Sequence, residues 1–163
     1  MNSIDQRLSD MGLQLPAPLV LPEGVRLPFR MVNVRGDRAF VSGHGPQNVD
    51  GTLAGPFGKV GCDVTAEEGY QLARKVALSM LGSLQRELGS LDRIAGWGRV
   101  FGMVNSAPGF VQQPRVINGF SDLVLALFGD ECGAHARSAV GMAELPFGAG
   151  VAVEIEAEVL LRS

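Results

Sequence analysis

The stretch from Ala136 to Val159, ARSAVGMAELPFGAGVAVEIEAEV, reads as two β-strands joined by a glycine-rich turn. The first predicted strand runs from Arg137 to Leu145 and the second from Val151 to Leu161. Apolar residues alternate with glutamates along the second strand, which predicts one buried and one polar face of a sheet. Arg137 opens the first strand and Glu154 lies inside the second, so the stretch also carries two candidate functional side chains.

These two side chains suit the binding and hydrolysis of a small acid. An arginine can bind a carboxylate through two parallel hydrogen bonds, and a glutamate on a rigid strand can move a proton to or from water. If the two strands pair as a hairpin with its turn near Gly148, Glu154 pairs near Met142. Arg137 then lies on the order of 16 Å away, unless a bulge shifts the pairing. A site that uses both side chains is therefore expected to be completed across a subunit boundary.

The rest of the chain alternates between predicted helices and strands. The helix from Thr65 to Leu88 has the clearest pattern, because Thr65 and Glu68 form a capping box and apolar residues recur every four positions. The other expected elements are a helix from Ser3 to Met11, a proline-rich arm over residues 13–28, a hairpin from Phe29 to Ser42, a strand from Ile94 to Val104 and a helix from Pro114 to Gly129.

This order predicts an α+β sandwich, with a five- or six-stranded mixed sheet and two long helices on one face. A chain of 163 residues with 46% hydrophobic and 19% charged residues fits one globular domain. No third long helix is available for the other sheet face, so a neighbouring subunit is expected to cover it.

Composition argues against several other classes of protein. The net charge of −3 gives no long-range attraction for nucleic acid. Cys62 and Cys132 form no CxxC pair, which disfavours a zinc site and fits unpaired thiols in a reducing cytoplasm. The N-terminus lacks the apolar core of a signal peptide, and no apolar run reaches the length of a membrane span. A cytoplasmic protein without a bound metal is expected.

Specific motifs resemble those of the RidA/YjgF family, also called reactive intermediate deaminase or endoribonuclease L-PSP. They are Ser42-Gly43, Asn118, the ARSAV and ELP segments that begin at Ala136 and Glu144, and VEIEA from Val153. The resemblance covers about residues 27–162, so residues 1–26 are treated as an N-terminal extension and 27–163 as the family domain. It implies a chorismate-mutase-like fold, a homotrimer with clefts between subunits, and hydrolysis of enamine or imine intermediates to keto acids and ammonia without a cofactor.

The resemblance also implies roles for individual residues. Arg137 matches the family arginine that binds the substrate carboxylate, and Glu154 matches the glutamate that positions or activates water. Ser42 and Gly43 match a pair that lines the pocket at the end of a strand, and Asn118 matches a pocket asparagine.

Two positions depart from the archetypal pattern. Phe29 stands where archetypal members have a tyrosine, and Ala139 stands where many have a cysteine. His44 and His135 flank the matched motifs, so each is a candidate for the pocket rim, with a hydrogen-bonded turn histidine as the alternative.

Three functions remain open from the sequence. The first is a hydrolase similar to 2-iminobutanoate/2-iminopropanoate deaminases, with Arg137 as the carboxylate clamp and Glu154 as the base. The second is a homotrimer that binds small carboxylates without turnover, which the absent tyrosine and cysteine favour. The third is an endoribonuclease, against which the acidic charge argues.

Overall fold

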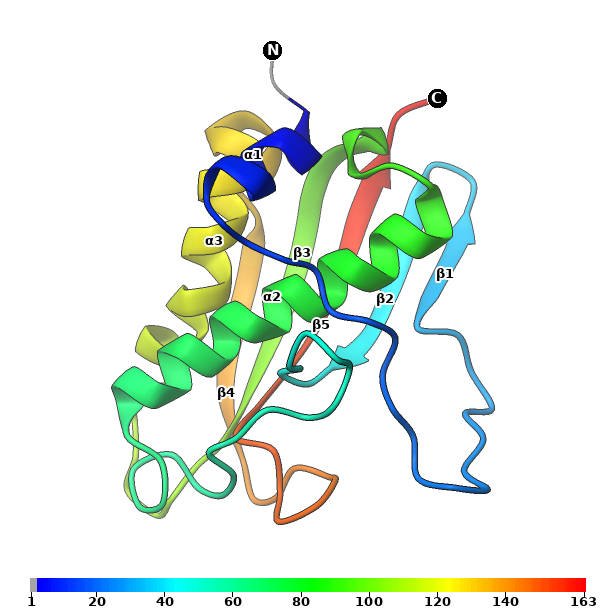
Figure 1. Cartoon of the computed structure of the whole chain (residues 1–163). Coiled ribbons are helices and arrows are strands. Elements are labelled where there is room, and N and C mark those ends of the chain that lie inside the picture. Colours follow the sequence, from blue (N-terminus) through cyan, green and yellow to red (C-terminus); the bar gives the residue numbers. More distant parts are fainter. Residues whose placement is uncertain (1–2) are drawn as a thin grey trace.

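The computed structural model describes residues 3–163 as one five-stranded sheet with helices packed against it (Figure 1). The strand order is β1-β2-β5-β3-β4; β3 and β4 are parallel, and all other neighbours are antiparallel. The elements are α1 (Ile4–Asp10), β1 (Val32–Arg35), β2 (Arg38–His44), α2 (Ala66–Leu88), a 3-10 turn (Leu91–Arg93), β3 (Ile94–Asn105), α3 (Gln113–Gly133), β4 (Ala136–Met142) and β5 (Val153–Leu161). The predicted α+β architecture is confirmed.

Helices α2 and α3 lie side by side across one face of the sheet (Figure 1). The predicted capping box begins α2: Thr65 Oγ1 accepts from the Glu68 N–H at 3.1 Å, and the Glu68 carboxylate accepts from the Thr65 N–H at 2.8 Å. Gly89 ends the helix at φ 80°, a left-handed conformation that favours glycine. The apolar stripe of α2 is buried as predicted and consists of Leu72, Val76, Met80, Leu84 and Leu88.

The other face of the sheet carries no helix within residues 3–163. Alternate residues of β5 point to the two faces, as predicted from the sequence. Val153, Ile155 and Val159 are buried beneath the helices, whereas Glu156 is exposed on the opposite face. We call this uncovered side the open face of the sheet.

The predicted hairpin of the last two strands is wrong. β3 lies between β4 and β5, so Glu154 pairs with Met103 and Arg137 pairs with Val100. A helix, α3, connects β3 to β4, and such a crossover favours parallel pairing of β3 with β4. β5 then pairs with the other edge of β3 and not with β4. The first strand of the stretch also ends at Met142, before the predicted end, and a loop runs to β5.

The N-terminal arm, residues 11–31, packs along the body of the domain. The Ala17 N–H donates to Val49 O at 2.9 Å, and the Val20 N–H donates to Gly51 O at 3.0 Å. Arg86 of α2 donates to Pro16 O at 3.0 Å. The arm therefore occupies a defined position beside the loop that follows β2. Among the helices of residues 3–163, none has the length and apolar character needed to span a bilayer.

Candidate active site

Strand β2 bends at its end, where it forms a bulge opposite β5. Val41 pairs with Ala157 and His44 with Ile155, so Ser42 and Gly43 together oppose a single residue of β5. A bulge re-aims the local backbone and is frequent beside active sites. It brings Gly43 against the side chain of Glu154, since a Cβ placed on Gly43 would lie 2.1 Å from Glu154 Oε1. A glycine is required here by this close approach.

Glu154 faces a cavity of about 260 Å³, which we call the Glu154 pocket. Its walls come from the bulge, the N-terminal arm, the loop after β2 and the loop before β5. The predicted site residues Gly43, Phe29 and His44 contribute to it. The remaining lining residues are Leu19, Leu27, Met31, Gly45, Gln47, Leu53, Pro146, Phe147 and Val151.

The Glu154 carboxylate is poised to exchange a proton. Burial raises its pKa above the ordinary value for glutamate, and the neighbouring charge of Glu156 adds to the effect. Within residues 3–163, no hydrogen bond or ion pair to this carboxylate is recorded. A half-buried carboxyl group with a raised pKa and free oxygens has the properties of a general base.

His44 and Ser42 stabilise the bulge through hydrogen bonds to neighbouring segments. The His44 ring is only 1% exposed, and its Nδ1 lies 2.6 Å from Ser42 O while its Nε2 lies 2.9 Å from Ser83 Oγ. Burial is the main cause that lowers the pKa of His44 to about 4, so the ring is neutral near pH 7. Ser42 Oγ donates to Arg30 O at 2.8 Å. Both ring nitrogens of His44 are thus occupied by structural contacts.

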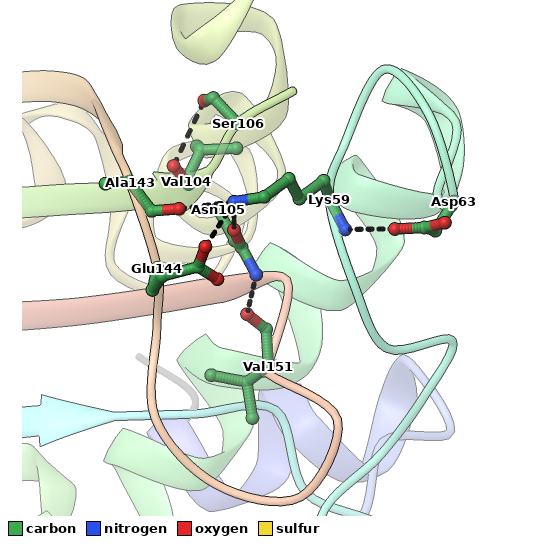
Figure 2. A network of polar contacts seen from close by, with 8 residues as sticks. All are labelled: Lys59, Asp63, Val104, Asn105, Ser106, Ala143, Glu144 and Val151. Carbon is green, nitrogen blue, oxygen red and sulfur yellow. Dashed lines mark hydrogen bonds and ion pairs between the residues drawn. The ribbon is translucent and has the colours of Figure 1, made fainter. Parts of the chain in front are cut away.

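Lys59 holds the start of the loop between β4 and β5 (Figure 2). Phe147 of this loop lines the Glu154 pocket. Its ammonium group donates to Asn105 Oδ1 at 2.9 Å and to Ala143 O, and it lies 3.4 Å from a Glu144 carboxylate oxygen. The Asn105 amide in turn donates to Val151 O at 3.4 Å, just before β5. Both ends of the loop are therefore tied to one polar network around the buried Asn105.

Arg137 forms a second cluster, which lies between β4 and α3. Its Nη1 donates to Asn118 Oδ1 at 2.8 Å and to Ser121 Oγ at 3.1 Å, and its Nη2 lies 3.5 Å from Pro114 O. Burial lowers the pKa of Arg137, while the charge of Asp122 opposes that shift. No ion pair to Arg137 forms among the described residues. The half-buried guanidinium group is held by neutral acceptors and can take a carboxylate ligand.

His135 belongs to the Arg137 cluster through Ser121. His135 Nε2 lies 2.9 Å from Ser121 Oγ, and His135 Nδ1 lies 2.7 Å from Gly133 O. Burial lowers the pKa of His135 as well. An N–H on Nδ1 bonded to Gly133 O leaves Nε2 to accept from Ser121, whose oxygen then accepts from Arg137. Ser121 was missed from the sequence, although its spacing of three residues from Asn118 places both on one helix face.

The two clusters do not meet within one chain. Arg137 and Glu154 lie across two strand spacings and three residues apart along β3, a Cα separation of about 14 Å. They also point to opposite faces, since Val100, the partner of Arg137, is buried under the helices and Glu154 is aligned with Met103. Ala139, two residues after Arg137 on the same side of β4, belongs with the Arg137 cluster. The expected separation of Arg137 from Glu154 thus persists although the hairpin is absent.

Residues 3–163 contain no group of three or more histidine, cysteine, aspartate or glutamate side chains that could hold a metal ion. Cys62 and Cys132 are both free thiols. The two clusters offer a guanidinium group at Arg137 that suits a carboxylate ligand, and a carboxyl group at Glu154 that suits proton transfer.

Comparisons with known proteins agree with this fold. Residues 5–159 match a family described as "YjgF/chorismate mutase-like, putative endoribonuclease". The chain is 45% identical to Protein TCP17 of Trypanosoma cruzi over 157 residues, which cover 96% of this chain and 92% of that protein.

Two solved bacterial structures are similar over nearly the whole chain. A protein of unknown function from Agrobacterium tumefaciens is 35% identical, with a TM-score of 0.84 and coverage of 98% of this chain and 92% of that one. A protein from Shewanella oneidensis, described as a "putative endoribonuclease", is 28% identical, with a TM-score of 0.85 and coverage of 98% of this chain and 100% of that one. The likeness includes the N-terminal arm, since residues before 27 lie within the matched range.

Proposed function

The chain belongs to the YjgF/chorismate mutase-like family, and from that premise we propose that it hydrolyses 2-imino or 2-enamino acids to 2-keto acids and ammonia. The proposed site lies in a cleft between subunits, where the Glu154 pocket of one chain meets the Arg137 cluster of another. The members of the Arg137 cluster are Arg137, Asn118, Ser121, His135 and Ala139.

One observation supports this proposal most strongly. Each chain carries a half-buried carboxylate at Glu154 and a half-buried guanidinium group at Arg137, and neither forms an ion pair among residues 3–163. Burying a charge without a partner costs free energy, so such groups persist mainly where a ligand or a reaction uses them. Their separation of about 14 Å on opposite sheet faces favours a neighbouring subunit as the source of the second group.

The proposed reaction adds water across the C=N bond. The substrate carboxylate binds Arg137 of the neighbouring chain, which places the imine carbon beside Glu154. The Glu154 carboxylate takes a proton from a water molecule as the water oxygen bonds to the imine carbon. That proton passes to the nitrogen, which leaves a carbon bearing one hydroxyl and one amino group. A second proton then moves from the hydroxyl to the amino group, the C–N bond breaks as the keto C=O bond forms, and ammonia leaves the 2-keto acid. Imine and water are the only reactants, and no electrons are exchanged with an oxidant or a reductant.

A homotrimer is the proposed assembly, with the open face of the sheet in the subunit contact. This face exposes Phe40, 43% accessible, together with Phe101 and the charged side chains of Arg99 and Glu156, around a hollow of about 550 Å³. Apolar side chains flanked by charges of both signs suit a contact between copies of one chain.

Two substitutions test the hydrolase. Arg137→Ala is expected to abolish turnover of a freshly generated 2-imino acid while the oligomer stays intact by light scattering. Glu154→Gln is expected to lower kcat by a factor of about 10²–10⁴ with little change in binding of the 2-keto acid product. Unchanged turnover in Arg137→Ala would contradict the proposal.

A second candidate is a trimer that binds small carboxylates without turnover. Phe29 at the pocket mouth, 54% exposed, supports it, because a phenyl ring offers no hydroxyl for proton transfer. In that case Arg137→Ala removes the thermal stabilisation by 2-keto acids, whereas Glu154→Gln keeps it and neither protein shows turnover. Metal-independent RNA cleavage lost in Arg137→Ala would instead support the ribonuclease named for relatives, against which the net charge of −3 argues.

A further inference from the structure

The N-terminal arm is held on both sides of the segment that passes the Glu154 pocket. Its first part is bonded to the loop after β2, through Ala17 and Val20. Its last part is bonded to the bulge, where the Ser42 N–H donates to Met31 O at 2.9 Å and Ser42 Oγ donates to Arg30 O. The segment between these anchors is thus kept in place beside the pocket.

Four residues of the arm line the pocket, and all four are apolar. They are Leu19, Leu27, Phe29 and Met31. Leu19 and Leu27 are partly exposed and lie outside the main core, so their side chains are available to a ligand. The arm therefore supplies an apolar wall to the site in addition to its packing role.

Glu154 is the one acidic or basic side chain among the described lining residues that is free to contact a ligand. The only other titratable group there, His44, already has both ring nitrogens bonded. Most of the remaining lining side chains are aliphatic or aromatic. A volume of about 260 Å³ lies just below the range of roughly 300–1,000 Å³ that holds whole drug-sized ligands. The cavity thus fits one apolar group attached to a polar reacting centre.

We propose that the arm forms the subsite for the substrate side chain, and that the preferred substrates are 2-imino acids with large apolar side chains, such as those derived from leucine, methionine or phenylalanine. This inference rests on the proposed function, because it requires the reacting carbon to lie beside Glu154. Each buried methylene group is worth roughly a fourfold gain in binding. The three extra carbons of a leucine-derived substrate therefore predict a preference of roughly 50-fold over an alanine-derived one.

The test compares two substrates and their two stable products. Imino acids of leucine and alanine are generated in place by an amino acid oxidase, and kcat/KM is measured for each. The dissociation constants of 4-methyl-2-oxopentanoate and pyruvate are measured by calorimetry. The variants are Leu27→Ala and Leu19→Ala, with Val25→Ala as the matched control, since Val25 is an exposed residue of the same arm that does not line the pocket.

The wild-type protein is expected to prefer the leucine-derived ligands in both measurements. Leu27→Ala should reduce that preference about tenfold. Val25→Ala should change neither. Equal affinity of the wild-type protein for both 2-keto acids, or an unchanged preference in both leucine variants, would overturn the subsite.

The two measurements separate this inference from the function on which it rests. Selective binding of 4-methyl-2-oxopentanoate that Leu27→Ala reduces, without turnover of any imino acid, would support the subsite and reject the hydrolase. Turnover without selectivity in either measurement would reject the subsite and support the hydrolase. Absence of both binding and turnover would overturn both.

Discussion

Replacing Gly43 with alanine should disable the Glu154 carboxylate and leave the fold intact. The new Cβ would lie 2.1 Å from Glu154 Oε1 and 3.0 Å from its Cδ, whereas ordinary contact begins near 3.4 Å. The carboxylate must therefore move by more than about 1 Å. A misplacement of that size can cost about 10²-fold in rate, so kcat/KM for a 2-imino acid should fall by about two orders of magnitude.

Stability should change much less than activity in Gly43→Ala. The clash involves the end of a flexible side chain, and Gly43 is not among the glycines with positive φ. A change within about 1 kcal/mol corresponds to about 2–4 °C in Tm for a domain of this size. Thermal unfolding and steady-state hydrolysis of the same protein samples measure the two effects.

Gly96→Ala is the matched control for Gly43→Ala. It makes the same change in β3, where the nearest atom to an added Cβ is Cys132 O at 4.0 Å. This variant should keep kcat/KM within about threefold of wild type. A folded Gly43→Ala protein with activity as high as that of Gly96→Ala would refute the contact between the bulge and Glu154 as the basis of catalysis.

The remaining predictions concern protonation and the pocket loop. Since burial raises the pKa of Glu154, kcat/KM should fall with decreasing pH at a midpoint above the ordinary glutamate value. The residual activity of Glu154→Gln should lack this acidic decrease. An identical pH profile in wild type and Glu154→Gln would argue against Glu154 as the base. His44 has a pKa of about 4 in the folded protein against 6.5 in the unfolded chain. Between these pH values the imidazole binds a proton in the unfolded chain but not in the folded protein. The free energy of unfolding should therefore drop by about 3 kcal/mol in total as the pH falls from 6.5 to 4. Urea denaturation of wild type and His44→Gln over that range measures this loss, and equal pH dependence of the two proteins would be the contrary result. Lys59→Met should destabilise the protein by about 1–3 kcal/mol because buried Asn105 and the Ala143 carbonyl lose a hydrogen-bond donor. Glu144→Gln should cost less than about 0.5 kcal/mol since the Glu144 side chain is 80% exposed. Equal shifts in Tm for the two variants would contradict this account of the network.

Local patterns in the sequence predicted most of the elements. Three predicted features are confirmed: the capping box at Thr65, the four-residue repeat through α2 and the alternation along β5. Each depends on residues only a few positions apart in the sequence. Ser3 likewise caps α1, with its hydroxyl accepting from the Gln6 N–H. Short-range physics is sufficient for features of this kind.

The pairing of strands and the shape of the site depended on contacts that local patterns do not report. A helix between β3 and β4 was itself a signal for parallel pairing of these two strands, but no local pattern tells which edge of the sheet β5 joins. The bulge at Ser42 and Gly43 depends on the register against β5, which is fixed by packing far along the chain. The position of Leu27 beside Glu154 depends on hydrogen bonds at both ends of the arm. The resemblance to a family supplied the candidate residues, and the structure supplied their grouping into two clusters.

Mixing two inactive variants tests the central claim, that Glu154 of one subunit acts with Arg137 of another. Arg137→Ala and Glu154→Gln proteins are purified separately, unfolded together, refolded in equal amounts and assayed with a 2-imino acid. If the site spans two subunits, about a quarter of the sites in random mixed oligomers join an intact Glu154 to an intact Arg137, and about a quarter of wild-type activity should return. If both residues of a site come from one chain, the mixture should be no more active than the two variants alone.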